Sequence, residues 1–273
     1  MKRFSWPVWV ACLLVAGFVA RGAYSFFLQP SNGGTMATNT LVFFPDRFTD
    51  PSARRFAEAV AAGKVDAALA AAHDAPGGVN TVGRDGATGL LMAVERHNLA
   101  MVDALLKAGA NPDGAPDRAP LHLAVSVRDL TMVKRLLAAH ADPNATMGTE
   151  TPLYMAGVMG EIPAAQALLD AGADINKADE VGKTPILAAA AADNWQTVAF
   201  LLDHDVSLWA DADGMTVAQF AQNSRILPNN PNGEALPRVI ERFRAAGYPW
   251  PPPNVAQVRA LKEEGKWPPP GKR

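Results

Sequence analysis

The chain has 273 residues, of which 49% are hydrophobic and 19% are charged, so it carries enough apolar material for a folded core. Its formal net charge is −2, which gives no basic footprint for nucleic acid, and we expect no nucleic-acid partner. The one cysteine, Cys12, lies in an N-terminal apolar run, so an internal disulfide is excluded and the body of the chain has no thiol ligand for a metal.

Residues 1–28 read as a membrane signal. Lys2 and Arg3 precede an uncharged run over residues 4–20, and apolar residues resume at 23–28. A run of 17 residues is at the short edge of what spans a bilayer, so an uncleaved signal-anchor helix, a cleaved signal peptide and a buried soluble helix all stay open. The positive charges before the run outweigh Arg21 behind it, which places the body outside the cytoplasm. In a bacterium we therefore expect a periplasmic body on an inner-membrane anchor, or a free periplasmic protein after cleavage.

Residues 29–51 are rich in Ser, Asn, Gly, Thr and Pro, and this composition predicts a linker. The short apolar run over residues 41–44 interrupts it. We interpret this run as a hydrophobic lid on the exposed end of the structure that follows; docking onto the first helix pair is the alternative.

Related phrases recur after the linker. The stretch 151–176 reads TPLYMAGVMGEIPAAQALLDAGADIN, and relatives of it begin at residues 88, 119 and 184. The spacings between successive units are 31, 32, 33 and 32 residues, counted between the anchors Thr88, Ala119, Thr151, Thr184 and Thr216. Such a period is typical of a solenoid array, in which each unit buries its apolar face against its neighbours.

Each unit carries start and stop signals for two helices. The hydroxyl of Thr151 or Thr184 can cap a helix, and the proline that follows each suits the first helical turn. Paired leucines mark where the second helix packs inward, at 105–106, 136–137, 168–169 and 201–202. Gly109 and Gly172 supply the left-handed residue that ends a helix. We expect strain where His140 and Asp205 take the same position.

These phrases closely resemble ankyrin repeats: Thr151-Pro152-Leu153, APLHLA from Ala119, and the closing LLDAGAD from Leu168. The resemblance covers residues 52–222, as about five to six units of which the first is degenerate. It implies an all-α fold, a solenoid of stacked antiparallel helix pairs with β-turn fingers, here preceded by an N-terminal hydrophobic helix. Residues 223–273 then form a C-terminal helical cap and a Trp/Pro-rich tail.

The tail contains two related Trp-Pro phrases, Gly247 to Pro253 and Gly265 to Pro270. Between them, Asn254 and Gln257 predict a capping box at the start of a short helix. Proline triplets favour polyproline II, which the grooves of other proteins recognise. Two roles stay open: a docking tail for a partner, or a tail whose Trp250 and Trp267 pack back on the last helix pair.

Catalytic signatures are missing from the sequence. The histidines lack the spacing of metal ligands, and there is no phosphate loop, zinc motif or nucleophile elbow. The resemblance implies a structural role for His122, whose imidazole holds the turn by hydrogen bonding. We expect no enzyme, no catalytic residue, no metal and no cofactor.

The resemblance also implies that the fingers and the ends of the first helices line a concave, partner-binding face. The central residues Val127, Met147, Val158, Met159 and Val181 are expected to form an exposed apolar patch rimmed by charges. Carried over position by position, the face holds Arg84, Asp85, Glu95, Arg96, Arg118, Val127, Met147, Glu150, Val158, Met159, Glu180, Val181, Lys183, Asp213 and Met215.

The function that we expect is a non-catalytic protein-binding module. The exported start, the repeats and the Trp-Pro ending resemble bacterial ankyrin proteins that act as immunity proteins against secreted toxic effectors. This resemblance implies that the protein sequesters and inhibits a periplasmic effector such as a lipase. The alternative is an envelope scaffold or stress-resistance protein that organises other membrane proteins.

Overall fold

The computed structural model describes residues 45–116 and 118–270. The chain divides into two units, Met1–Phe44 and Pro45–Arg273, and only the second is described below. The expected hydrophobic helix and most of the linker therefore lie outside the described residues. Within the described part, no helix is both long and apolar enough to cross a membrane.

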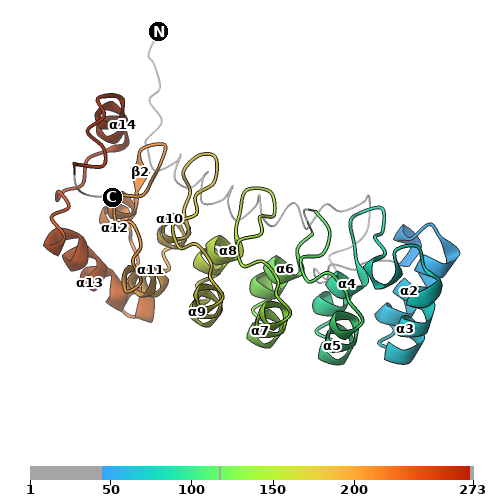
Figure 1. Cartoon of the computed structure of the whole chain (residues 1–273). Coiled ribbons are helices and arrows are strands. Elements are labelled where there is room, and N and C mark those ends of the chain that lie inside the picture. Colours follow the sequence, from blue (N-terminus) through green and yellow to red (C-terminus); the bar gives the residue numbers. More distant parts are fainter. Residues whose placement is uncertain (1–44, 117, 271–273) are drawn as a thin grey trace, which may run out of the picture. The chain divides into compact units, whose positions relative to one another are not determined.

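The described unit is a row of helix pairs, which confirms the mostly helical, stacked arrangement (Figure 1). The first helices of the pairs are α2 (Pro51–Ala61), α4 (Gly89–Glu95), α6 (Pro120–Ser126), α8 (Pro152–Met159), α10 (Pro185–Ala191) and α12 (Val217–Asn223). The second helices are α3 (Val65–Asp74), α5 (Leu99–Lys107), α7 (Leu130–Ala138), α9 (Ile162–Asp170), α11 (Trp195–Leu202) and α13 (Pro231–Ala245), and α14 (Val255–Glu263) follows them. Two 3-10 turns complete the helical elements, η1 (Pro45–Arg47) and η2 (Gly78–Asn80).

Turn-like fingers join each pair to the next. In the last finger, β1 (Asp211–Ala212) and β2 (Met215–Thr216) pair antiparallel, with Asp211 opposite Thr216. The earlier fingers contain single antiparallel bridges, which join Val82 to Thr88, Ala115 to Arg118 and Met147 to Glu150. The fingers lie along one side of the row of helices, above it in Figure 1.

The threonine signals start helices as predicted, but they do not all cap in the same way. The hydroxyls of Thr88 and Thr151 accept hydrogen bonds from the backbone N–H of Leu91 and Tyr154, each at 3.1 Å. Thr184 also precedes a helix, but its hydroxyl oxygen is buried without a hydrogen-bond partner. The predicted hydroxyl cap at Thr184 is therefore wrong, and Pro185 alone supports that helix start.

The core runs between the two rows of helices. The first helices have neighbours on several sides, and residues 152–157 of α8 are all buried. The second helices are amphipathic: α7 buries Met132, Val133 and Leu136 and exposes its other face. Of each predicted leucine pair, only the first member is fully buried, because the second lies at the edge of the buried face. The buried members are Leu105, Leu136, Leu168 and Leu201.

A ladder of polar side chains connects successive units at the ends of the second helices. The side-chain oxygen of an Asn or Asp in one unit accepts a backbone N–H from the next unit, at 2.6 to 2.8 Å. Since these backbone groups have no partner in their own loop, the ladder satisfies them and fixes the stacking. The accepting residues are Asn80, Asp113, Asn144 and Asn176.

The left-handed helix endings agree with prediction in three of four units. Gly109 and Gly172 have φ of 88° and 90°, and His140 adopts a φ of 64°, the expected strained position. The expectation for Asp205 is wrong, because Asp205 has no positive φ. Helix α11 ends at Leu202, one residue earlier in its unit than α9 does, so the chain leaves the helix without a left-handed residue at that position.

The Trp/Pro tail packs back on the last helix pair. Trp267 is 9% exposed, and its ring lies 5.2 Å from that of Trp209. Tyr248 stacks on Trp209 at 4.4 Å, and the guanidinium of Arg244 lies over Trp250 at 5.1 Å. Helix α14 begins at the predicted capping box of Asn254 and Gln257. Aromatic residues at both ends thus hold α14 against the array.

Candidate protein-binding surface

In the first, fourth and fifth fingers, an aspartate of the turn accepts backbone N–H groups of the same turn. Asp179 Oδ1 accepts the backbone N–H groups of Val181 and Lys183, at 2.9 and 2.8 Å. Asp211 Oδ1 accepts the N–H of Gly214 at 3.0 Å in the next finger. An aspartate that bonds the backbone two or three residues ahead is a common turn device. These turns hold the side chain of Val181 in solvent.

The five residues of the predicted apolar patch differ in exposure. Val181 is 55% exposed and Val127 is 37% exposed, whereas Met147, Val158 and Met159 are half-buried. Neighbouring units bond the backbone of the last two: Asn194 donates to the carbonyl of Val158 at 2.8 Å, and Arg128 donates to that of Met159 at 2.8 Å. The accessible apolar surface is therefore smaller than the predicted patch.

The first finger adds an apolar residue that sequence reasoning missed. Val82 is 53% exposed and is bridged to Thr88. The same position in the other fingers holds Asp113, Ala145, Ala178 and Ala210. A β-branched residue where the other units carry small or acidic residues is the signal that identifies it.

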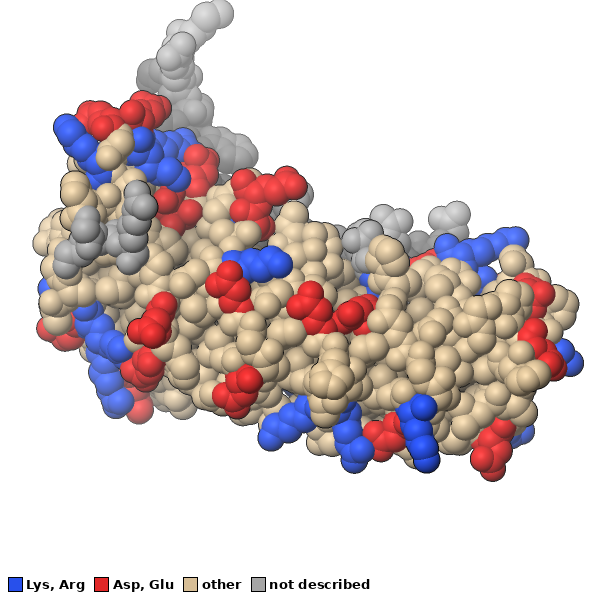
Figure 2. All heavy atoms as spheres, in the orientation of Figure 1, with Lys and Arg blue, Asp and Glu red and all other residues tan. Residues whose placement is uncertain are grey.

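The charged residues of the predicted face fall into two groups. Arg84, Arg96, Glu180 and Asp213 are exposed. The partly buried ones are Asp85, Glu95, Arg118, Glu150 and Lys183, and Met215 is partly buried as well. In the space-filling view, the visible surface is largely uncharged, and acidic and basic residues are interspersed across it (Figure 2). A mixed surface of this kind favours a protein partner over nucleic acid.

The third finger is held from the preceding unit by His122. Its Nε2–H donates to the backbone carbonyl of Glu150 at 2.8 Å, and the ring is fully buried. Burial, the largest effect, lowers the pKa of His122 to about 4, although the bond to Glu150 acts in the opposite direction. A neutral imidazole thus serves as a structural donor, which agrees with the role implied for His122.

Glu150 and Tyr154 share a partly buried site beside the fourth finger. Burial raises the pKa of the Glu150 carboxyl; Lys183 lowers it and Asp179 raises it further. Burial also raises the pKa of the Tyr154 hydroxyl, and Glu150 and Asp179 add to that effect. The carboxyl of Glu150 is therefore more basic than an exposed one.

The fifth finger is covered by the chain itself. Arg259 of α14 donates from Nε to Asp213 Oδ1 at 3.0 Å, and Lys262 lies 2.7 Å from Asp211 Oδ1. Gln219 Nε2 donates to the carbonyl of Pro253 at 2.6 Å. Of the predicted face, Asp213 thus lies against α14, whereas Glu180 and Val181 of the fourth finger remain open.

The described residues include no cluster of three His, Cys, Asp or Glu side chains that could hold a metal ion. The surface that the fingers expose to a partner consists of turns, valines and isolated charges. Such features can bind another macromolecule by shape and charge.

Comparisons with known proteins support the interpretation of the repeats. The family model described as "Ankyrin repeats (3 copies)" matches residues 56–147 and 90–179. The human neurogenic locus notch homolog protein 4 is 47% identical over 58 residues, which are 21% of this chain and 3% of that protein. The Drosophila melanogaster neurogenic locus Notch protein is 48% identical over 61 residues, 22% of this chain and 2% of its own length. The chain thus spans only a few per cent of the length of these relatives.

Period, helix pairs, fingers and family model agree from residue 56 to residue 179, and arrays of this type serve as protein–protein interaction modules. The chain contains ankyrin repeats, which the family model matches over residues 56–179.

Proposed function

We propose that this chain is a non-catalytic binding module whose fingers and first-helix ends hold one protein partner. One observation carries the proposal. Four large hydrophobic residues are exposed in the described unit, and three of them, Val82, Val127 and Val181, lie on the fingers or on the end of a first helix. Exposed apolar residues that gather on one face mark protein-binding surfaces, whereas scattered ones do not.

The partner that we propose is a secreted toxic effector, such as a lipase, which the module sequesters and inhibits on the periplasmic side of the membrane. The support comes from the sequence: Lys2 and Arg3 precede an apolar run that predicts export, and a Trp/Pro ending follows the repeats. A scaffold that organises envelope proteins uses the same surface. It differs in the consequence of deletion, because loss of an immunity protein harms cells only when the effector is present.

The surface is tested with two matched substitutions in the full-length chain. Val181→Asp places a charge on the fourth finger, and Leu227→Asp places the same charge on the other exposed apolar residue, which is 64% exposed and precedes α13. We expect Val181→Asp to weaken partner binding about tenfold or more, as for a central interface residue. Leu227→Asp is expected to leave binding unchanged, and both variants should keep the melting temperature of the parent.

Partner and surface are identified together by photo-crosslinking in cells. A benzoylphenylalanine at position 181 should capture one protein. The same group in place of Lys134, which is exposed on the second helix α7 and away from the fingers, should not. Equal capture at both positions argues against a finger site. If cells that lack the protein resist every effector encoded beside it, the immunity role is wrong although the binding module stands.

A further inference from the structure

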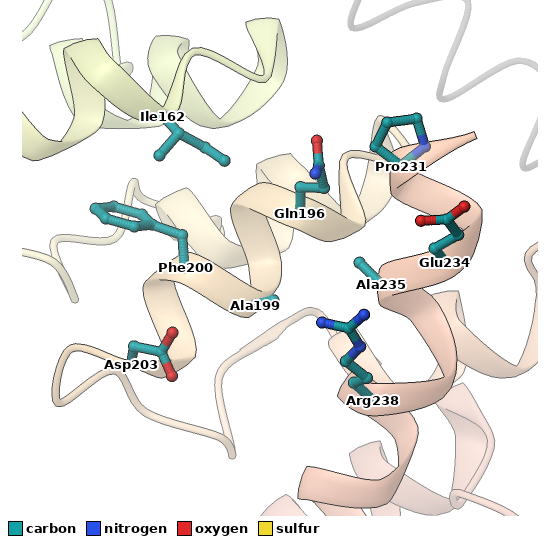
Figure 3. A pocket seen from close by; sticks show the side chains of 9 residues that line it. All are labelled: Ile162, Gln196, Ala199, Phe200, Asp203, Pro231, Glu234, Ala235 and Arg238. Carbon is teal, nitrogen blue, oxygen red and sulfur yellow. The ribbon is translucent and has the colours of Figure 1, made fainter.

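A second surface lies on the second helices, away from the fingers. An open hollow of about 300 Å³ is bordered by α9, α11 and α13. Figure 3 shows Ile162 and Phe200 on one side of it, Ala199 and Ala235 at its floor, and Glu234 and Arg238 on the side of α13. One wall is thus apolar and the other is charged.

The outward face of α11, which borders the hollow, differs from that of the other second helices in carrying an aromatic residue. Ala199 stands where the preceding units carry Asp103, Lys134 and Gln166. Phe200, which follows it, stands where they carry Ala104, Arg135 and Ala167. In α5 and α7 this outward face carries charges, and Arg135 pairs with Asp103 at 2.6 Å, whereas α9 carries the uncharged Gln166 and Ala167. At α11 the same two positions supply an aromatic wall and a floor without polar groups.

The charges beside the hollow are available to a partner. Arg242 and Arg244 of α13 are paired, with Asp203 and with Glu241. By contrast, the side chains of Glu234 and Arg238 form no hydrogen bond or ion pair with any described residue, although they are four positions apart on one helix face. Arg238 points from α13 toward α11 in Figure 3. Its guanidinium is therefore free to pair with a carboxylate that approaches over Ala199.

We propose that this hollow receives an amphipathic helix of a partner protein, which seats one leucine-sized side chain between Phe200 and Ala235 and pairs a carboxylate with Arg238. The volume of the hollow suits a single side chain rather than a whole ligand, because it lies at the lower limit of pockets that enclose small ligands. The charges support a carboxylate next to that side chain, since the unpaired guanidinium of Arg238 lies directly beside the apolar floor of the hollow. The site is separate from the finger surface and does not depend on its function.

The test uses labelled helical peptides and the full-length chain. The peptides share one leucine stripe and differ at a single flanking position, which is Glu, Gln or Lys. Fluorescence anisotropy should show the Glu peptide binding about fivefold more tightly than the Lys peptide, the effect of an ion pair worth roughly 1 kcal/mol. Arg238→Glu should reverse that order, and Phe200→Asp should remove binding of all three.

Two controls separate the site from folding and from the fingers. Arg238 is exposed, so its substitution tests the pairing even if Phe200→Asp lowers stability. Lys134→Glu, on the equivalent face of α7, and Val181→Asp, on the fourth finger, should leave peptide binding unchanged. The proposal is overturned if no peptide binds, or if Arg238→Glu leaves the order unchanged. It is also overturned if Phe200→Asp converts a self-associated chain to a monomer in sedimentation, because the occupant is then a second copy.

Discussion

Asp213 at the tip of the fifth finger is paired with Arg259 of α14, a residue 46 positions later in the chain. The adjacent Gly214 shows how closely the two elements lie, because a Cβ placed there would be 2.8 Å from the carbonyl oxygen of Val255. Gly182 of the fourth finger has the same relation to the fifth finger, since its Cβ would lie 2.4 Å from the Asp211 carbonyl oxygen. Helix α14 therefore occupies the position that a sixth finger would take. It ends the row of fingers, as α13 ends the row of helices.

The ion pairs between α14 and the fifth finger predict which substitution frees α14 from that finger. Arg259→Glu replaces the attraction to Asp213 with repulsion, and this pair is exposed, so the cost to global stability should be about 1 kcal/mol or less. Hydrogen exchange should accelerate in residues 255–263 and stay unchanged in α4 to α11. Lys266→Glu is the control, because Lys266 pairs only within the tail, with Glu264 at 2.7 Å. Equal effects of the two substitutions would contradict a role for the finger contact.

The N-cap of α6 offers a test of the repeat signals. Ala119 stands where α4, α8, α10 and α12 are preceded by threonine, and α6 has no side-chain cap. Ala119→Thr should add the bond that Thr88 and Thr151 make and raise the free energy of unfolding by about 1 kcal/mol. Thr151→Ala should lower it by a similar amount. Urea unfolding measures both, and a destabilised Ala119→Thr variant would show that the buried position lacks room for the hydroxyl.

The array could be predicted from sequence because its signals are local and repeat. Threonine, proline and glycine act within one turn of themselves, and the period brings equivalent residues together. The half-burial of Met159 was not predictable in the same way. The end of α8 meets the preceding unit, where the guanidinium of Arg128 reaches the Met159 carbonyl across 31 positions.

The tail shows the same limit. The capping box of Asn254 predicts that α14 exists, but not where it lies. Its position depends on Trp209, Tyr248 and Trp267 meeting in one cluster, and on ion pairs with the fifth finger. Such contacts between distant residues carry no periodic signal. The finger residues themselves stay a prediction until a partner is identified.

The buried His122 predicts a loss of stability in mild acid. Its pKa is about 4 in the folded chain, below the ordinary value of 6.5, so folding favours the neutral ring. Its contribution is then complete above about pH 6.5 and is lost as the pH falls toward about 4, by about 3 kcal/mol in total. His122→Gln keeps a donor without the titration. Carboxyl groups titrate in both proteins, so the difference between their pH–stability curves isolates His122; parallel curves between pH 6.5 and 4 would contradict the prediction.

Gly214 and Gly172 form a matched pair that tests whether α14 is packed on the finger row. Both have a positive φ, of 85° and 90°. A Cβ at Gly172 would meet nothing within 4 Å, whereas at Gly214 it would meet the Val255 carbonyl. Gly172→Ala should therefore cost only backbone strain, about 1 kcal/mol. Gly214→Ala should cost about 1 to 3 kcal/mol more and increase exchange in α14, because the helix must move away from the finger. If both variants lose the same stability and α14 stays protected, the helix does not rest on Gly214 and the finger row ends at the fifth finger itself.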